Sequence, residues 1–312
     1  MQAQEQRMMR WAVIMRTKNP SHQRFADDFN AGRIVRTHLF RCTWQLVCAG
    51  DLHWMLSLCG ERNRNVVKGW MKTYRRRLPA QSAYAEARQA IRSILQGCRI
   101  TTRIELLKRM SALGIEGDER QLSIHLYLAE ADGTICSGQL HPSKVTYALV
   151  DEICPDPKVL SREKALAELA TRYFQSHSPA TLEDFVWWTG LPKSDCLKAI
   201  QGIAKNLTEL KVHGTTLYLH KNCRTRGCRE SYILLPSYDE YLIGYKSRQY
   251  ALDEAHSHHA HNKIGVFYPV ILHRGEVVGN WLPKQQTTSF FTPNEESDMR
   301  DAFIKYERAM NR

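Results

Sequence analysis

Two segments of this chain repeat one order of helices, turns and strands, and the repeat constrains the fold more than any other feature of the sequence. Apolar periodicity predicts three helices followed by a strand within residues 83–137, and the same order recurs within residues 161–220. The matching positions are Leu106 with Phe185, Gly114 with Gly190, Leu122 with Leu197, and Ile135 with Leu210. We therefore expect two copies of one structural unit.

Each copy has the order of elements of a winged helix: three helices, the second and third joined by a tight glycine turn, and a closing hairpin. The second helices are expected to begin with capping boxes, because Glu105 follows Thr102 at the required spacing and Asp184 follows Thr181. Thr101 and Ser178 are alternative N-caps.

The third helix of a winged helix usually reads the major groove of DNA. In both copies this helix is only modestly basic, with Arg120 and Gln121 in the first and Lys193 and Lys198 in the second. Packing of these helices as scaffold is therefore as good an interpretation as direct reading of bases.

The flanking segments complete an α+β chain. Residues 34–47 are rich in β-branched and aromatic side chains, and Asp51 begins a helix predicted over 52–58, as in a further, partial winged helix. Strands dominate after the second copy, at 232–235, 267–272 and 276–281, before a final helix over 295–310. We predict tandem winged-helix units, two clear and one partial, followed by a C-terminal β-barrel-like domain. The expected domains are residues 1–82, 83–160, 161–222 and 223–312.

The positive charge of the chain is concentrated in its first third. Residues 1–110 hold 21 Lys and Arg against 7 Asp and Glu, a balance of +14 in a chain whose net charge is +12. Such an excess favours a polyanionic partner, since neutralising phosphates releases counterions, and duplex DNA is the partner we expect. A solvated basic face is the alternative. The candidate DNA contacts here are Arg36, Arg41, Thr43, Lys68, Lys72, Arg75, Arg76 and Arg77.

Several classes of protein and site are not expected. No run approaches the roughly 18 apolar residues of a membrane span, and the N-terminus has no signal-peptide core, which favours a cytoplasmic, nucleoid-associated protein. The nine cysteines include no Cys-x-x-Cys pair, so reduced thiols are expected.

Histidines of 256–261, near Cys223 and Cys228, do not have the spacing of standard zinc sites, so no metal is expected. There is no phosphate-binding glycine loop, so we expect no nucleotide cofactor. We also expect the protein to be a monomer.

A loop ahead of the predicted C-terminal strands combines carboxylates, aromatics and bases. Tyr238, Asp239, Lys246 and Arg248 are candidate DNA contacts, with Asp239 or Glu240 facing the reactive sugar. A polar network that pins the β domain is the alternative interpretation.

A pair of tryptophans, Trp187 and Trp188, lies at helical spacing with Phe185. This pattern favours a place in the core over a platform for stacked bases.

Four stretches of the sequence carry a family resemblance: residues 34–54, 170–191, 234–246 and the hairpin through 279–281. On these stretches the chain resembles the winged-helix DNA glycosylases of the AlkZ/AlkX (YcaQ-like) type, a group of winged helix DNA-binding domain-containing proteins. The resemblance covers nearly the whole chain. It implies tandem winged helices with a C-terminal β-barrel, and an enzyme of DNA repair that excises N7-alkylated purines and unhooks interstrand crosslinks.

The resemblance also implies a catalytic site. The family signature is Gln-x-Gln or Gln-x-Asp between the first helices of its N-terminal winged helix, and Gln2-Ala3-Gln4 stands at that place. A guanine alkylated at N7 carries positive charge, so its glycosidic bond is weak and a neutral amide that orients water suffices. We expect a monofunctional DNA glycosylase in which Gln2 and Gln4 are catalytic; a non-catalytic DNA-binding protein, a regulator or a degenerate family member, is the alternative.

The chain departs from the family pattern at two places. The family has about one more helix ahead of the signature, whereas Met1 directly precedes it here, as expected for an internal methionine of a longer product or for loss of that helix. Gln45 stands where the family often has histidine.

Overall fold

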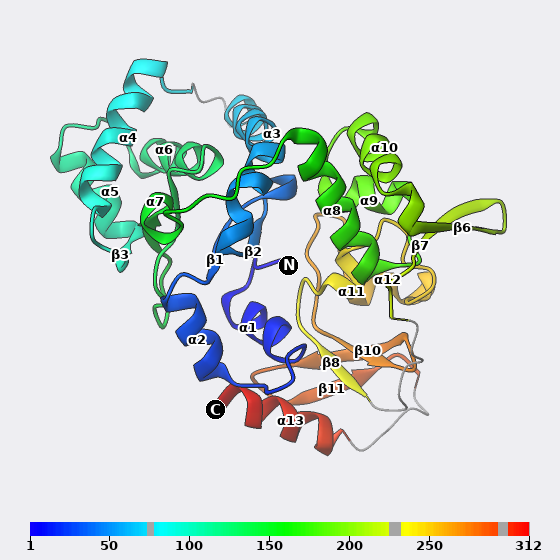
Figure 1. Cartoon of the computed structure of the whole chain (residues 1–312). Coiled ribbons are helices and arrows are strands. Elements are labelled where there is room, and N and C mark those ends of the chain that lie inside the picture. Colours follow the sequence, from blue (N-terminus) through cyan, green and yellow to red (C-terminus); the bar gives the residue numbers. More distant parts are fainter. Residues whose placement is uncertain (74–77, 225–231, 293–298, 312) are drawn as a thin grey trace. The chain divides into compact units, whose positions relative to one another are not determined.

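The fold is described from a computed structural model, covering residues 1–73, 78–224, 232–292 and 299–311 (Figure 1). These residues form two compact units. The first unit combines Met1–Phe25 with Leu166–Arg312, and the second is Ala26–Ala165. The two boundaries fall within helices α2 (His22–Asn30) and α8 (Arg162–His177), and α8 lies mostly in the first unit. Each unit is described by itself.

The second unit begins with a hairpin and a long helix. Strands β1 (Ile34–His38) and β2 (Trp44–Cys48) pair antiparallel, as the sequence predicts, with Arg36 opposite Leu46. Helix α3 (Leu52–Thr73) continues for 22 residues, far beyond the predicted end at residue 58. It continues because its later turns also bury an apolar face, with Val67 and Met71 in one cluster.

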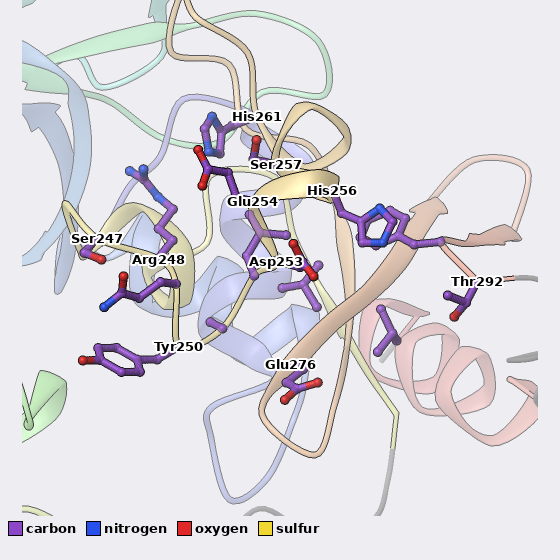
Figure 2. A pocket seen from close by; sticks show the side chains of 16 residues that line it. Ser247, Arg248, Tyr250, Asp253, Glu254, His256, Ser257, His261, Glu276 and Thr292 are labelled. Carbon is purple, nitrogen blue, oxygen red and sulfur yellow. The ribbon is translucent and has the colours of Figure 1, made fainter. Parts of the chain in front are cut away.

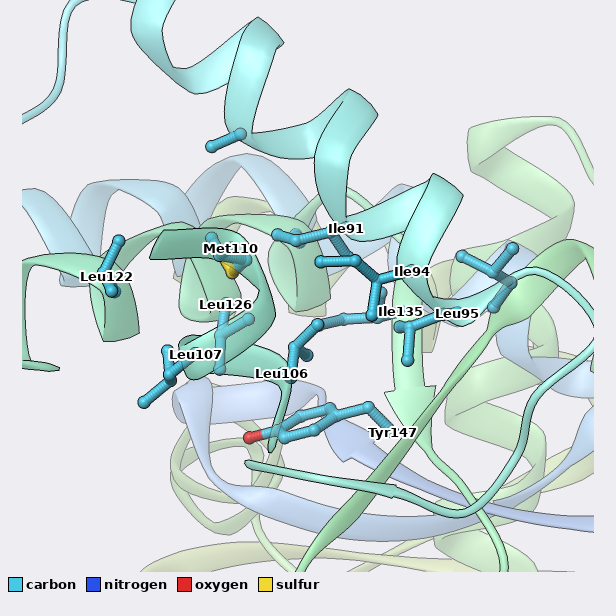
Figure 3. Packing of buried hydrophobic residues seen from close by; sticks show 13 residues of the cluster. Ile91, Ile94, Leu95, Leu106, Leu107, Met110, Leu122, Leu126, Ile135 and Tyr147 are labelled. Carbon is cyan, nitrogen blue, oxygen red and sulfur yellow. The ribbon is translucent and has the colours of Figure 1, made fainter. Parts of the chain in front are cut away.

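Four helices and a small sheet follow in this unit, and the first three helices come in the order that the first repeat predicts. The helices are α4 (Gln81–Leu95), α5 (Arg103–Ala112), α6 (Glu119–Ala131) and the short α7 (Val150–Ile153), and the strands are β3 (Thr101–Thr102), β4 (Ile135–Ser137) and β5 (Thr146–Leu149). The antiparallel sheet has the order β3-β5-β4. Figure 3 shows its core, where Ile91, Leu106 and Tyr147 meet from a helix, a second helix and a strand.

The predicted start of α5 is confirmed in atomic detail. Thr102 accepts a hydrogen bond from the backbone N–H of Glu105, and the Glu105 carboxylate accepts one from the backbone of Thr102 in return. This capping box satisfies N–H groups that a helix start otherwise leaves without partners. Gly114, in the turn after α5, has φ of 82°, a conformation that favours glycine.

The first unit contains the second repeat. Its elements are α8 (Arg162–His177), α9 (Leu182–Thr189), α10 (Lys193–Gly202), the 3-10 turn η3 (Ala204–Asn206), β6 (Leu207–Val212) and β7 (Thr215–His220). Thr181 and Asp184 form the predicted capping box at the start of α9. Gly190 ends this helix with a left-handed φ of 63°, so both predicted glycine turns are confirmed.

The two repeats differ in what they bury. Leu106 and Phe185 are both fully buried, as their alignment predicts. Leu197 and Leu210, however, are 39% and 38% exposed, whereas their counterparts Leu122 and Ile135 are buried. Helix α10 turns Cys196, Ala199 and Ile200 inward instead, and β6 belongs to a two-stranded sheet that covers less of its surface. The matched positions of these last two pairs therefore differ in burial between the two repeats.

The C-terminal part of the first unit is built around an open sheet. Its strands are β8 (Ile233–Leu235), β9 (Val270–His273), β10 (Glu276–Leu282) and β11 (Thr287–Phe290), and its helices are α11 (Glu240–Ile243), α12 (Ser257–Ala260) and α13 (Arg300–Asn311), with the 3-10 turn η4 (Glu254–His256) ahead of α12. The four antiparallel strands have the order β11-β10-β9-β8, and within the described residues β8 does not pair with β11. The expected barrel is thus not closed here, because the described strands number too few to curl back on themselves.

The N-terminal residues pack onto this sheet, within the same unit. In helix α1 (Gln6–Ile14), Trp11 donates a hydrogen bond of 2.6 Å from Nε1 to the carbonyl of Leu234. Its ring meets that of Tyr306 edge to face, with centroids 5.1 Å apart. Residues 1–25 are therefore held by the C-terminal half of the chain.

Candidate functional site

The Gln2-Ala3-Gln4 segment directly precedes α1 in the first unit. Gln2 is buried, 3% exposed, and its backbone N–H donates a hydrogen bond of 2.8 Å to Oε1 of Glu240. Gln4 is half-buried, and among the described residues its side-chain amide makes no hydrogen bond. Glu5 caps α1 by accepting from the backbone N–H groups of Arg7 and Met8, so the segment is fixed at both ends.

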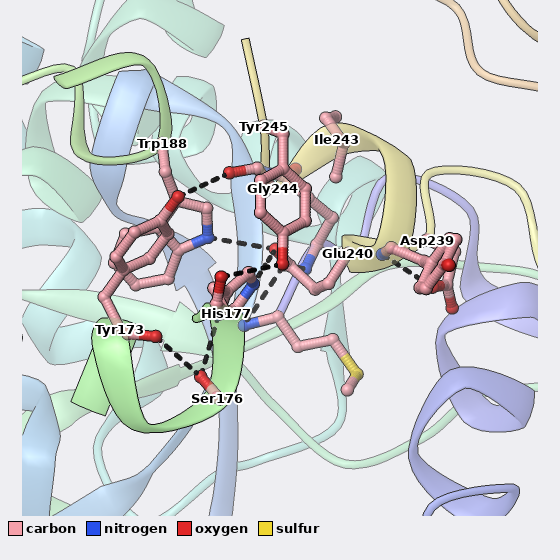
Figure 4. Close-up of polar contacts among 12 residues, drawn as sticks. Tyr173, Ser176, His177, Trp188, Asp239, Glu240, Ile243, Gly244 and Tyr245 are labelled. Carbon is pink, nitrogen blue, oxygen red and sulfur yellow. Dashed lines mark hydrogen bonds and ion pairs between the residues drawn. The ribbon is translucent and has the colours of Figure 1, made fainter. Parts of the chain in front are cut away.

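Glu240, the first residue of α11, lies at the centre of a polar cluster (Figure 4). The indole Nε1 of Trp188, from α9, donates a hydrogen bond of 2.9 Å to Oε2 of Glu240. Nε2 of His177, at the end of α8, lies 3.9 Å from the same oxygen. Two helices, α8 and α9, and the N-terminal segment thus converge on the carboxylate that α11 carries.

The imidazole of His177 is held in place from two sides. It stacks on the ring of Tyr173 with centroids 4.6 Å apart and planes 11° from parallel. Gly244 approaches it so closely that a Cβ on this glycine would lie 2.8 Å from Cδ2 of His177. The hydroxyl of Tyr245 donates a hydrogen bond of 3.0 Å to the backbone carbonyl of the same histidine.

The contacts of Glu240 keep it ionised. Burial raises the pKa of its carboxyl, but His177, the Met1 ammonium group and Trp188 together outweigh burial and hold the pKa well below its ordinary value. Glu240 is therefore a half-buried anion, ionised at neutral pH.

Asp239, a candidate DNA contact, lies in the interior of the unit. It is 4% exposed, and its Oδ1 accepts a hydrogen bond of 2.7 Å from Nη2 of Arg16. The same carboxylate caps α11 by accepting from the backbone N–H of Tyr241. This burial and pairing favour the alternative interpretation, a polar network that fixes the C-terminal part of the chain.

The other candidates of this loop lie nearer the surface. Lys246 is exposed, and its backbone N–H donates to Oδ1 of Asp184 over 2.8 Å. Arg248 is half-buried, donates to the carbonyl of Leu242, and lies 5.6 Å from the ring centroid of Trp187. Tyr238 is half-buried with a φ of 56°.

The candidate DNA contacts of the N-terminal third differ in how far their side chains are exposed to solvent. Arg36 is 3% exposed and lies 3.9 Å over the ring of Trp44, and burial lowers its pKa to about 10 although Glu130 raises it. Arg41 and Thr43 are half-buried at the tip of the β1–β2 hairpin. A buried guanidinium is less available to phosphate than an exposed one.

Lys68 and Lys72 are exposed on α3, where Arg64 is exposed too. The three residues recur every four positions, so they lie along one face of the helix. Arg75, Arg76 and Arg77 fall outside the described residues.

The second unit also buries a polar group that the sequence analysis did not find. His38 contacts the carboxylate of Glu130, and its ring lies 4.1 Å from that of Trp44. Asn63, fully buried, donates to the carbonyl of Leu39 over 2.8 Å. These contacts tie the β1–β2 hairpin to α3 and α6.

Gln45, the position where the family often has histidine, is buried in the same unit. Its side-chain amide donates a hydrogen bond of 2.9 Å to the carbonyl of Phe40 across the hairpin tip.

A cavity of about 740 Å³ lies elsewhere in the first unit (Figure 2). Its polar lining includes Arg248, Asp253, Glu254, His261 and Glu276, and none of the residues of the Glu240 cluster. In the part of the chain that the structure describes, no group of three or more His, Cys, Asp or Glu is placed to hold a metal ion. The cavity therefore offers no observation that ties it to the Gln-x-Gln segment.

Two residues of the Glu240 cluster escaped the sequence analysis as site residues. Trp188 was assigned to the core with Trp187, yet it is half-buried and its Nε1 binds the carboxylate. His177 gave no signal at all, because a single histidine at a helix end has no motif of its own. A polar indole beside a predicted helix turn was the one available hint.

No helix in the described ranges has the length and apolar character needed to cross a membrane.

Comparison with known proteins gives one family and one structure. Residues 1–294 match the family described as DNA glycosylase AlkZ-like. The structure of Streptomyces sahachiroi DNA glycosylase AlkZ is similar, with a TM-score of 0.78 and 22% sequence identity, over 99% of this chain and 86% of that one. At this identity the likeness concerns the fold, a mixed α+β architecture. No curated protein matches the chain.

Proposed function

Because this chain belongs to the family of AlkZ-like DNA glycosylases, we propose that it hydrolyses the N-glycosidic bond of N7-alkylated purines in duplex DNA. The observation that carries the proposal is the Gln2-Ala3-Gln4 segment, held against the half-buried carboxylate of Glu240 by the backbone of Gln2. Bulky adducts and interstrand crosslinks at the same purine atom belong to the proposed substrate class.

The chemistry requires little of the protein. Alkylation at N7 gives the purine a positive charge, so the base leaves readily and the sugar passes through an oxocarbenium-like transition state. In the proposed mechanism the half-buried amide of Gln4 orients the attacking water by hydrogen bonds, and Gln2 assists. An amide does not remove a proton from water. No proton needs to be removed before the glycosidic bond breaks, because the alkylated base is already a cationic leaving group.

DNA binding is expected of this family, and we place it in the basic N-terminal third. The support is the exposed face of α3 that carries Arg64, Lys68 and Lys72, which recur at helical spacing without an intervening acid on that face. Lys246 and Arg248 of the first unit, with Tyr238, remain proposed contacts, as do Arg41 and Thr43.

The finer architecture follows the same proposal. We assign the α4–α6 group with its three-stranded sheet and the α8–α10 group with β6 and β7 to winged helices, within domains 83–160 and 161–222. Residues 1–82 and 223–312 are the other two proposed domains. The protein is proposed to act as a cytoplasmic monomer on DNA.

Release of 7-methylguanine from methylated duplex DNA tests the proposal. Wild-type protein should release the base, and Gln4→Ala should lower the rate by about 100-fold, since catalytic groups act only when correctly placed. Gln175→Ala is the matched control, because Gln175 is exposed on α8 of the same unit and far in the chain from the N-terminal glutamines, and its rate should equal that of wild type. A second substrate, a duplex crosslinked through guanine N7, tests the bulky class.

A folded wild-type protein that binds DNA and releases no base would contradict the enzymatic proposal. That outcome would favour the competing function, a non-catalytic DNA-binding protein of the same family.

A further inference from the structure

We propose that Glu240 is a positioning residue for the reaction: its carboxylate holds the Gln2-Ala3-Gln4 segment by the backbone of Gln2 and so aims the amide of Gln4. The inference rests on the proposed function, since it deepens the assignment of that segment. It gives a role to a residue 238 positions away in the chain.

Both oxygens of the Glu240 carboxylate already accept hydrogen bonds from the protein. Oε1 accepts the backbone N–H of Gln2 at 2.8 Å, and Oε2 accepts Nε1–H of Trp188 at 2.9 Å with His177 at 3.9 Å. The side chain of Glu240 is 13% exposed. An anion whose two oxygens both face protein donors is poorly placed to take a proton from water, so it acts through the segment that it binds.

The adjacent carboxylate, that of Asp239, holds the chain on the other side of α1. Asp239 binds Arg16, which follows α1, while Glu240 binds Gln2, which precedes it. Two successive residues of the chain therefore fix the N-terminal segment on either side of one helix. This arrangement determines where the Gln-x-Gln motif lies relative to the rest of the unit.

An ionised carboxylate is needed at position 240 to accept hydrogen bonds from both of its partners. The groups that face it, the N–H of Gln2 and Nε1–H of Trp188, are both donors. A glutamine at this position has one acceptor oxygen and one donor NH2 group, so it satisfies one of these contacts and opposes the other. Glu240→Gln thus changes the hydrogen bonding with almost no change in shape.

The experiment compares wild type, Glu240→Gln and Glu276→Gln, an identical substitution at an exposed site on β10 of the same unit. We expect Glu240→Gln to lower the single-turnover rate of 7-methylguanine release by about tenfold or more, with the Kd for methylated DNA within about twofold of wild type. Hydrogen exchange of residues 1–8 should be faster in Glu240→Gln and unchanged in Glu276→Gln. A merely structural role would not separate rate from affinity in this way.

A wild-type rate in Glu240→Gln would overturn the inference, as would a fall in rate matched by an equal loss of DNA affinity. If Glu240→Gln does not fold, Trp188→Phe removes the indole donor to Oε2 together with part of the ring that packs against Tyr173 and His177. A lowered rate at unchanged Kd then supports the inference and an unchanged rate overturns it. If wild type releases no base, the proposed function fails by itself. The exchange of residues 1–8 then still decides whether Glu240 holds the segment.

Discussion

Gly244 lies at a position where the structure leaves no room for a side chain. A Cβ there would come within 2.5 Å of the carbonyl oxygen of Glu240 and 2.8 Å of Cδ2 of His177. The glycine thus allows the end of α11 to pack directly against the imidazole. The packing of His177 beside Glu240 therefore depends on the absence of a side chain at Gly244.

Gly244→Ala should therefore destabilise the first unit. We expect a loss of about 1–3 kcal/mol in the free energy of unfolding, because backbone and a ring must shift to admit the methyl group. Urea denaturation followed by tryptophan fluorescence measures it. Gly202→Ala is the control, because its Cβ would make an ordinary contact of 3.5 Å with Ala167; equal losses in both variants would refute the packing argument.

The lowered pKa of Glu240 predicts a pH dependence of stability. A carboxyl with a depressed pKa in the folded state stabilises it above the unfolded pKa, and this contribution is lost as pH falls toward the folded value. Glu240→Gln removes the titrating group, so its unfolding free energy should fall less steeply between about pH 5 and pH 2 than that of wild type. Denaturation series across this range measure the slopes. Glu276→Gln should keep the wild-type slope, and identical slopes for all three proteins would contradict the prediction.

At this scale the sequence pointed to Gln2 and Gln4 through a family motif, but it gave no means of finding their neighbours. The sequence offers Glu240 only as a group that faces DNA, and it gives no signal for His177. The reason is physical: the contact between Gln2 and Glu240 spans almost the whole chain, whereas periodicity and spacing report on residues that are close in sequence.

The two capping boxes show what can be read locally at the scale of a helix. Both boxes follow from the spacing of a threonine and an acid, since the groups that bond are three residues apart. The structure adds that the two acids are not equivalent. Asp184 is buried and also accepts the backbone N–H groups of Lys246 and Ser247, whereas Glu105 is exposed.

Asp184→Asn should consequently destabilise more than the equivalent change Glu105→Gln. An amide at position 184 turns a donor toward backbone N–H groups, and we expect a loss of about 1–3 kcal/mol in the free energy of unfolding. Chemical denaturation of the two variants measures the difference. The prediction fails if the two substitutions destabilise equally.

Other elements could not be predicted because tertiary packing decides them. Helix α3 extends to Thr73 since Val67 and Met71 pack against Ile124 and Leu128 of α6, a surface that no local pattern reveals. Strand β11, with two threonines and a serine, has too little apolar content to signal a strand and forms because it pairs with β10.

The assignment of residues 1–25 shows the limit at the scale of the whole molecule. Trp11 and Arg16 bind Leu234 and Asp239, each 223 positions away in the chain. Chain proximity is a good guide to domain membership only when contacts are local. Here a terminal helix crosses to a distant sheet, and it carries the Gln-x-Gln segment with it.

The distribution of charge predicts which element binds DNA. If the basic third carries the phosphate contacts, replacing both Lys68 and Lys72 by alanine should weaken binding about equally for all sequences and reduce the salt slope of log K by about 2. The comparison variant replaces Lys193 and Lys198 on α10, the third helix of the second repeat. Fluorescence anisotropy of a labelled duplex at several salt concentrations measures both slopes. A slope that falls for the α10 variant and not for the α3 variant would reverse the assignment, and would make the repeat itself, rather than the basic third, the DNA-binding part of the chain.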